Sequence, residues 1–155
     1  MSPQNITHPP MKVTSDDCWI CESLQKDRHL VFFETETSTA KLNPDQYFLG
    51  YSFVVFNKHE VELYDISDEE RREFLEDMSS VARALALTFK PDKMNYELLG
   101  NGQPHMHWHL VPRYKSDPLW GRPIWTGGTR RKRLGQEAYT DLVNRIRKHL
   151  AAARK

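Results

Sequence analysis

The chain has 155 residues, with 22 basic and 21 acidic side chains, so its formal net charge is only +1. A chain of this length fits one domain with a sizeable core, and its charge balance does not favour binding to nucleic acid or to a membrane surface. No apolar run approaches the roughly 20 residues that span a bilayer. Residues 1–14 are rich in proline and polar side chains and lack an apolar signal sequence. We therefore expect a flexible arm there and a cytoplasmic protein.

The first half of the chain predicts strands followed by a helix. Residues 29–33 and 49–56 are rich in β-branched and aromatic side chains, which favour strands. The threonine-rich residues 34–48 are ambiguous, although they can continue as a hairpin. Ser67 and Glu70 have the spacing of a capping box. The helix that follows has apolar residues at helical spacing, namely Phe74, Met78, Val81 and Leu85.

The second half predicts a hairpin, an irregular loop and a last helix. Residues 94–99 form a candidate strand, and the turn at residues 100–102 leads into a further strand at residues 104–113. Residues 116–128 contain two prolines, three glycines and two tryptophans, a composition typical of an irregular loop. A helix over about 136–151 has one apolar side, formed by Tyr139, Val143, Ile146 and Leu150. The fold class predicted is α+β, with about five mostly antiparallel strands and two main helices.

The segment at residues 104–113 contains the pattern most indicative of chemistry. His105, His107 and His109 alternate with the apolar residues Met106, Trp108 and Leu110. Successive side chains of a strand point to opposite faces, so the three imidazoles share one face. Imidazole can attack, donate a proton or bind a metal near neutral pH. This strand is therefore the expected functional site.

The histidine pattern resembles that of the histidine triad (HIT) family of nucleotide hydrolases and transferases. The match includes the residues 110–113, Leu-Val-Pro-Arg, that follow the triad, and the segment 50–59, which begins with glycine and ends in Lys-His. The cysteine pair Cys18-x-x-Cys21 is similar to that of one branch of the family. The resemblance implies a HIT-like domain over residues 15–155 and a homodimer.

Two departures from the family pattern concern loops near the site. The family commonly has three residues between a Gly-Gln pair and the first triad histidine. Here Gly102-Gln103 is followed directly by Pro104 and His105. The proline that commonly follows the second strand is replaced by Phe56-Asn57.

The resemblance implies that His107 is the nucleophile and forms a nucleotidyl-histidine intermediate. His109 would then protonate the leaving group, and Asn101 and Gln103 would donate to the phosphate. The expected substrate is a nucleotide phosphoanhydride or phosphoramidate, with a dinucleoside polyphosphate as the sharper expectation. The acceptor can be water, phosphate or another group.

Two cysteines supply half of a tetrahedral zinc site. The resemblance to galactose-1-phosphate uridylyltransferase nominates His59 and His105 as the other ligands of Cys18 and Cys21, in a structural zinc site with no organic cofactor. The alternative is a pair of reduced cysteines without metal. A redox role fits less well, because no βαβ pattern surrounds the pair.

Several other residues have two interpretations each. Asn43 has the spacing at which the family places a ribose contact, and it is also a turn former before Pro44. Trp120 and Trp125 can stack on a base or bury their loop. The basic run at residues 130–133 is a solvated face or a contact to outer phosphates.

Two further functions stay open. In a metal-dependent hydrolase, the three histidines would together bind a catalytic metal. A non-catalytic nucleotide-binding protein would bind the same ligands without turnover.

Overall fold

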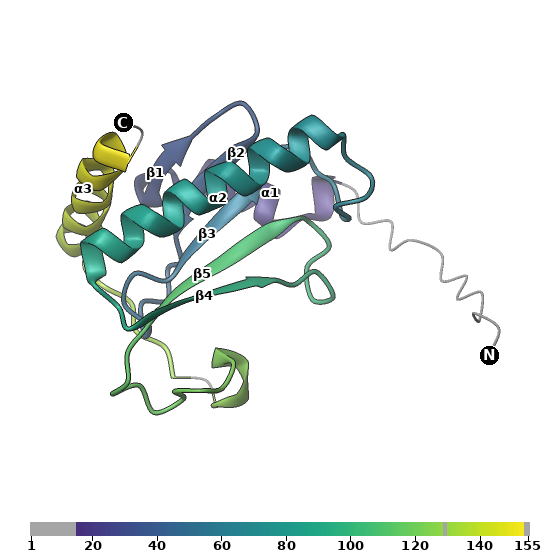
Figure 1. Cartoon of the computed structure of the whole chain (residues 1–155). Coiled ribbons are helices and arrows are strands. Elements are labelled where there is room, and N and C mark those ends of the chain that lie inside the picture. The colour runs from purple at the N-terminus through teal and green to yellow at the C-terminus, as the bar shows by residue number, and fades with distance from the viewer. Residues whose placement is uncertain (1–14, 129, 154–155) are drawn as a thin grey trace.

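The computed structural model describes residues 15–128 and 130–153 (Figure 1). The arm expected at residues 1–14 lies outside the described residues. The described part of the chain contains a five-stranded open sheet and three α-helices. The prediction of an α+β fold with an antiparallel sheet is therefore confirmed. In the described residues, no helix has both the length and the apolar character needed to cross a membrane.

The sheet has the strand order β1-β2-β3-β5-β4, and all neighbouring strands are antiparallel. The threonine-rich segment does continue as a hairpin. Register between β3 and β5 places Phe53 opposite His109 and Val55 opposite His107. The strands are β1 (Val31–Glu34), β2 (Ser38–Leu42), β3 (Ser52–Phe56), β4 (Lys93–Leu98) and β5 (His107–Arg113).

Two long helices, α2 (Asp68–Phe89) and α3 (Gln136–Ala153), pack against each other, and both contact the sheet (Figure 1). The capping box predicted at Ser67 and Glu70 is present at the start of α2. The apolar residues predicted for both helices are buried in one core with the sheet. These residues are Phe74, Met78, Val81, Leu85, Tyr139, Val143, Ile146 and Leu150.

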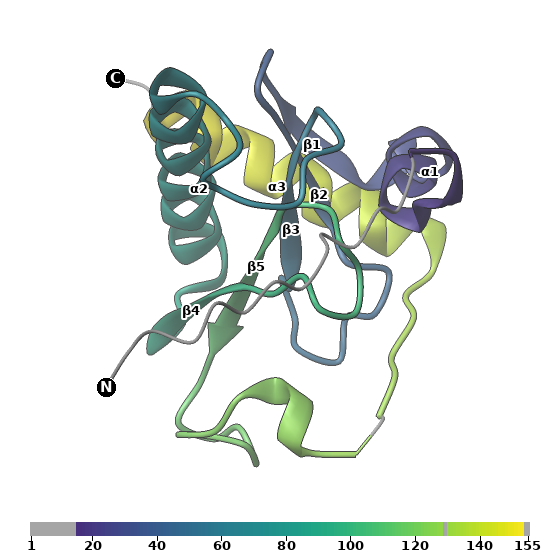
Figure 2. The ribbon, with the colours of Figure 1, turned by 90° about the vertical axis from the view of Figure 1, so that its right-hand side faces the viewer.

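A third helix, α1 (Trp19–Lys26), was not predicted from the sequence. It lies on the side of the sheet opposite to α2 (Figure 2). α1 has only eight residues, of which Ile20 is buried. The sequence of this helix therefore contains no long apolar stripe that would predict it. The buried side chain of Lys41 on β2 forms an ion pair with Asp27, the residue directly after α1. Tertiary contacts of this kind stabilise a helix too short to persist alone.

Alternation along the strands separates the two faces of the sheet. Met106 and Leu110 belong to the core under α2 and α3, and Trp108 packs against it. Tyr51, Phe53 and Val111 belong to a smaller cluster on the other face, together with residues of α1. The three predicted apolar residues of the histidine segment therefore do face the helices.

Gly50 is required where the chain enters β3. Its φ angle is +87°, a conformation that side-chain-bearing residues rarely adopt. A Cβ atom at this position would also lie 2.7 Å from the ring of Phe89 at the end of α2.

Candidate active site and metal centre

His107 begins β5 and is 4% exposed. Its Nδ1 lies 2.6 Å from the carbonyl oxygen of His105, an acceptor, so Nδ1 carries the proton. Burial lowers the pKa of His107, so the ring is neutral near pH 7. The lone pair of this imidazole is therefore on Nε2.

His109 lies two residues further along the same face of β5. The ring centroids of His107 and His109 are 4.6 Å apart, and Phe53 of the neighbouring strand contacts both rings edge-on. Nδ1 of His109 lies 2.6 Å from the hydroxyl of Tyr51. Burial, and then the charge of His107, lowers the pKa of His109 to about 3. Both imidazoles are therefore neutral groups in an apolar setting.

His105 precedes β5 and belongs to a different cluster. Its Nδ1 lies 3.5 Å from Sγ of Cys18 and 3.3 Å from Sγ of Cys21, and His59 Nδ1 lies 3.5 Å from Sγ of Cys21. All four ligand atoms lie within 4.8 Å of one another. With Zn–S of about 2.3 Å and Zn–N of about 2.0–2.1 Å, a tetrahedral site would separate sulfur from nitrogen by about 3.5 Å. The cluster therefore has the composition and spacing of a closed tetrahedral site.

The surroundings of His105 favour its role as a ligand. Nε2 of His105 lies 2.7 Å from the carbonyl oxygen of Phe56, so this nitrogen donates and Nδ1 keeps its lone pair. Burial lowers the pKa of His105 to about 4. Burial and the neighbouring Cys18 raise the pKa of the Cys21 thiol to about 11, an effect that a bound cation would oppose.

A cavity of about 760 Å³ opens beside Tyr51. Aromatic and aliphatic side chains form much of its wall, and the indole of Trp125 contacts both Tyr51 and His109. Arg130 and Arg131 bring positive charge to it. The apolar wall consists of Tyr47, Phe48, Tyr51, Pro118, Leu119, Ile124 and Trp125. Its size and lining suit a small aromatic ligand with an anionic part.

Residues that follow the histidine strand form one wall of this cavity. Arg113, the last residue of β5, is 2% exposed and donates to the carbonyl oxygens of Leu119 and Arg122. The segment then reaches η3 (Ile124–Thr126), which carries Trp125. Further along, Lys132 makes backbone hydrogen bonds to Gln46 and to the carboxylate of Asp45. The chain after β5 therefore returns to the loop before β3.

The structure brings only some of the predicted ligand contacts to the cavity. Asn43 lines it, and its Oδ1 accepts from the amide of Asp45, as expected of a turn former; the ribose contact stays a prediction. Gln103 lies beside the metal cluster, with Nε2 3.5 Å from Sγ of Cys18. Asn101 is exposed in the turn before the triad. Trp125 lies at the cavity, whereas Trp120 lines a separate hollow of about 390 Å³.

The sequence did not predict that Tyr51, Phe48 and Ile124 line the cavity. The strand pattern contained a signal for Tyr51. Tyr51, Phe53 and Val55 alternate, and antiparallel pairing of their strand with the histidine strand places them on the face of His107 and His109. Phe48 and Ile124 lie in loops whose return to the site no local pattern indicates.

The described fold agrees with comparisons to known proteins. Residues 25–116 match the model of the HIT domain family. A protein from Bacillus subtilis, "Protein hit", is 26% identical over 118 residues, which cover 72% of this chain and 80% of that protein. This chain belongs to the HIT domain family, as the histidine pattern predicted.

Two solved structures illustrate the shared fold. A zinc-bound histidine triad family protein from Mycobacterium smegmatis superposes with a TM-score of 0.67 at 22% identity, covering 90% of this chain and 96% of the other. A diadenosine triphosphate hydrolase from Plasmodium falciparum has a TM-score of 0.60 at 17% identity, covering 81% and 79%.

Proposed function

We propose that this protein is a nucleotide hydrolase or nucleotidyltransferase that forms a covalent nucleotidyl-histidine intermediate on His107. The observation that carries the proposal is the hydrogen bond from Nδ1 of His107 to the carbonyl oxygen of His105. This bond leaves the Nε2 lone pair for attack on phosphorus. Membership of the HIT family supports the same role.

His109 is the group proposed to stabilise the leaving oxygen. Its ring lies beside that of His107 on the same face of β5. The ring is neutral, and its Nδ1 is hydrogen-bonded to the hydroxyl of Tyr51. In the first step, Nε2 of His107 bonds to phosphorus while the bond from phosphorus to the leaving oxygen breaks. His109 donates a hydrogen bond to that oxygen as negative charge develops. Water or another acceptor then attacks phosphorus and releases His107.

The cavity beside Tyr51 is proposed to hold the nucleotide. Trp125 offers an indole face that is half exposed, and Asn43 offers an amide that suits sugar hydroxyls. Arg130 and Arg131 supply positive charge for phosphates beyond the reacting one. These features favour a substrate with several phosphates, such as a dinucleoside polyphosphate.

We propose that Cys18, Cys21, His59 and His105 hold structural zinc. Their ligand atoms have tetrahedral spacing, and they come from α1 and the residue before it, the segment after β3 and the segment before β5. A metal bound there would tie these segments together beside His107. It would supply cross-linking only, because four protein ligands leave no open position for substrate.

The geometry disfavours a catalytic metal bound by all three histidines. Nδ1 of His105 faces the cysteines. By contrast, Nδ1 of His107 is hydrogen-bonded to a carbonyl oxygen, and Nδ1 of His109 is hydrogen-bonded to a tyrosine hydroxyl. In the described residues, the cysteine cluster is the one converging set of metal-ligand side chains.

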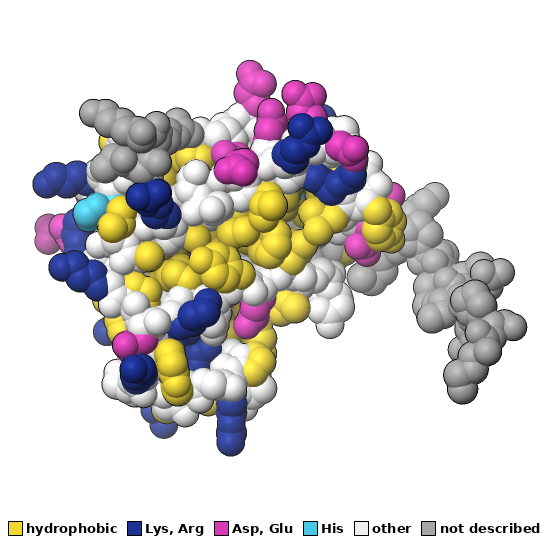
Figure 3. All heavy atoms as spheres, in the orientation of Figure 1, with side chains coloured by type: hydrophobic (Ala, Val, Ile, Leu, Met, Phe, Trp, Pro, Cys, Tyr) yellow, Lys and Arg dark blue, Asp and Glu magenta, His cyan; other side chains and the backbone are white. Residues whose placement is uncertain are grey.

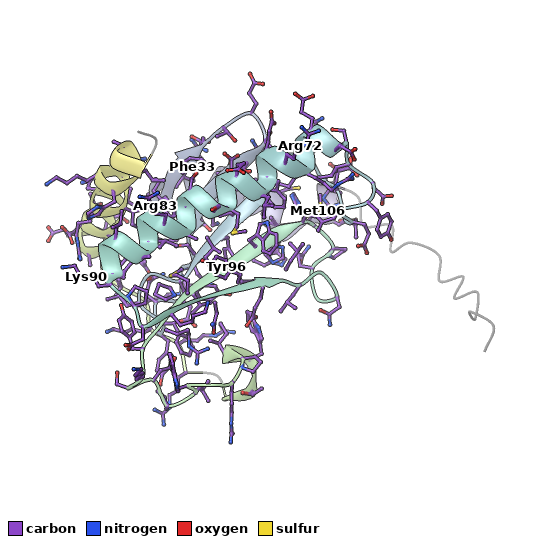
Figure 4. The ribbon with its side chains drawn as sticks, in the orientation of Figure 1. Phe33, Arg72, Arg83, Lys90, Tyr96 and Met106 are labelled. Carbon is purple, nitrogen blue, oxygen red and sulfur yellow. The ribbon has the colours of Figure 1, made fainter. Side chains whose placement is uncertain are left out.

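A homodimer is proposed through the face that carries β4 and α2. β4 is an edge strand, which exposes backbone groups on one side. Figure 3 shows hydrophobic side chains gathered on this face, and Tyr96, labelled in Figure 4, lies there and is 46% exposed. Light scattering would show a dimer for the wild type and a monomer for Tyr96→Glu, with Tyr64→Glu as an exposed control. A monomeric wild type would contradict this proposal.

The proposed mechanism is tested by trapping the intermediate. Wild type, His107→Ala and the exposed-site control His29→Ala are incubated with an adenylated substrate that carries labelled α-phosphate, then quenched in acid and in base. We expect acid-labile, base-stable label on the wild type and on His29→Ala only. Turnover that persists in His107→Ala without labelled protein would overturn the mechanism.

A further inference from the structure

The hydroxyl of Tyr51 and Nδ1 of His109 are 2.6 Å apart in the protein interior. Tyr51 is 5% exposed and His109 is 6% exposed, so water has little access to either group. Tyr51, directly before β3, and His109 on β5 therefore share one short, buried hydrogen bond. Its direction decides which nitrogen of His109 carries the proton.

Within hydrogen-bond distance of the Tyr51 hydroxyl, the described residues offer one side-chain partner, Nδ1 of His109. The side chain of Asn43, which also lines the cavity beside Tyr51, accepts through Oδ1 from the backbone amide of Asp45 at 2.8 Å.

The phenol proton then has one described acceptor. A buried O–H group without an acceptor is costly, by about 1–3 kcal/mol. Nδ1 of His109, at 2.6 Å, is therefore the acceptor for the hydroxyl of Tyr51. Burial raises the pKa of Tyr51, so the phenol stays protonated and acts as a constant donor.

We propose that Tyr51 is a positioning residue that keeps His109 in the Nε2–H tautomer. Nδ1 of His109 accepts from the phenol, which leaves Nε2–H as the donor for the leaving oxygen. This inference rests on the proposed function for its catalytic consequence. The tautomer itself is a property of the free protein.

The two neutral histidines of the site then have opposite tautomers. His107 carries its proton on Nδ1 because a carbonyl oxygen accepts there, whereas His109 carries its proton on Nε2 because a phenol donates to Nδ1. One ring offers a lone pair and the other an N–H group, from side chains on the same face of β5. Attack on phosphorus and stabilisation of the leaving oxygen need this pair of groups.

The tautomer is tested by nitrogen NMR on labelled protein, with His109→Gln to assign the resonances. We expect wild-type His109 to show protonated Nε2 and unprotonated Nδ1. Tyr51→Phe should give mixed tautomers, because Nδ1 of His109 then loses its hydrogen-bond donor. Tyr114→Phe is the matched control, since its phenol also donates to a partner, the carbonyl oxygen of Phe89. An unchanged His109 in Tyr51→Phe would overturn the inference.

The catalytic consequence is tested with two adenylates, adenosine 5′-phosphate esters of phenol and of 4-nitrophenol. A donor to the leaving oxygen matters more for the more basic leaving group. We expect Tyr51→Phe to lower kcat for the phenyl ester by about 10²-fold and for the nitrophenyl ester much less. Equal losses for both esters would contradict the role in leaving-group stabilisation. No wild-type turnover of any nucleotide would contradict the proposed function and leave the tautomer result standing.

Discussion

The guanidinium of Arg113 and the carboxylate of Asp117 form an ion pair between side chains that are only 2% and 5% exposed. The same guanidinium donates to Asn95, Leu119 and Arg122, and it lies over the ring of Phe48. Its nitrogens are thus all used within the protein. Arg113 connects the end of the histidine strand to the loop that forms one wall of the cavity.

This relationship predicts a large effect on stability. Arg113→Met would leave Asp117 as a buried, unpaired charge, and we expect the free energy of unfolding to fall by about 3–5 kcal/mol. Urea unfolding measures the change. Arg145→Met, which removes an exposed pair with Asp141, should cost less than about 1 kcal/mol. Equal effects of the two variants would show that burial of the Arg113 pair is not decisive.

The metal centre predicts a second outcome. Cys21→Ser removes one of the four proposed ligands, so we expect the variant to lose the zinc ion that we propose each chain binds, together with several kcal/mol of stability. Elemental analysis of purified protein and thermal unfolding measure both changes. His29→Gln changes an exposed histidine outside the cluster and should keep its zinc. Wild-type protein that binds no zinc from a zinc-containing buffer would contradict the assignment.

The basic run at residues 130–133 allows an internal comparison. Arg130 and Arg131 line the cavity, whereas Lys132 and Arg133 do not. The double variant Arg130→Gln/Arg131→Gln should raise KM for a dinucleoside polyphosphate about 10-fold, because hydrogen bonds to charged groups contribute about 1.5–3 kcal/mol each and exposure weakens them. Steady-state kinetics tests this, with Lys132→Gln/Arg133→Gln as the control. If the two double variants behave alike, the run acts through general charge alone.

The buried His109 predicts a dependence of stability on pH. Its pKa is about 3 in the folded protein and 6.5 ordinarily, so the unfolded chain takes up the proton first as pH falls. The contribution of neutral His109 to stability is complete above about pH 6.5 and is lost progressively below it. The titratable groups around the ring are Tyr51, His107 and, opposite His109 on β4, Glu97.

Denaturant unfolding at pH 7 and pH 5 measures this effect. We expect His109→Gln to lose about 1–2 kcal/mol less stability than the wild type over this interval, because glutamine does not titrate. The contributions of titratable groups that both proteins share cancel when their changes in unfolding free energy are compared. An identical loss in both proteins would show that the pKa of His109 is not lowered.

Local patterns allowed much of the fold and part of the site to be predicted. Alternation of His105, His107 and His109 with apolar residues indicated a strand with one functional face, and the spacing of Ser67 and Glu70 indicated the start of α2. Both patterns follow from geometry repeated within a few residues. Family resemblance, not spacing, nominated His59 and His105 as partners of the cysteines, and the structure brings these four residues together.

Contacts between segments distant in sequence were decided only by the tertiary structure. α1 is held by Lys41 and by burial of Ile20, and neither contact has a local periodicity. The bond between Tyr51 and His109 joins residues 58 positions apart, and the return of Lys132 to Asp45 spans 87. The sequence by itself thus determined the strand that carries His107 and His109. The tertiary structure decided which groups surround them, because burial and hydrogen-bond direction depend on the packing of the whole chain.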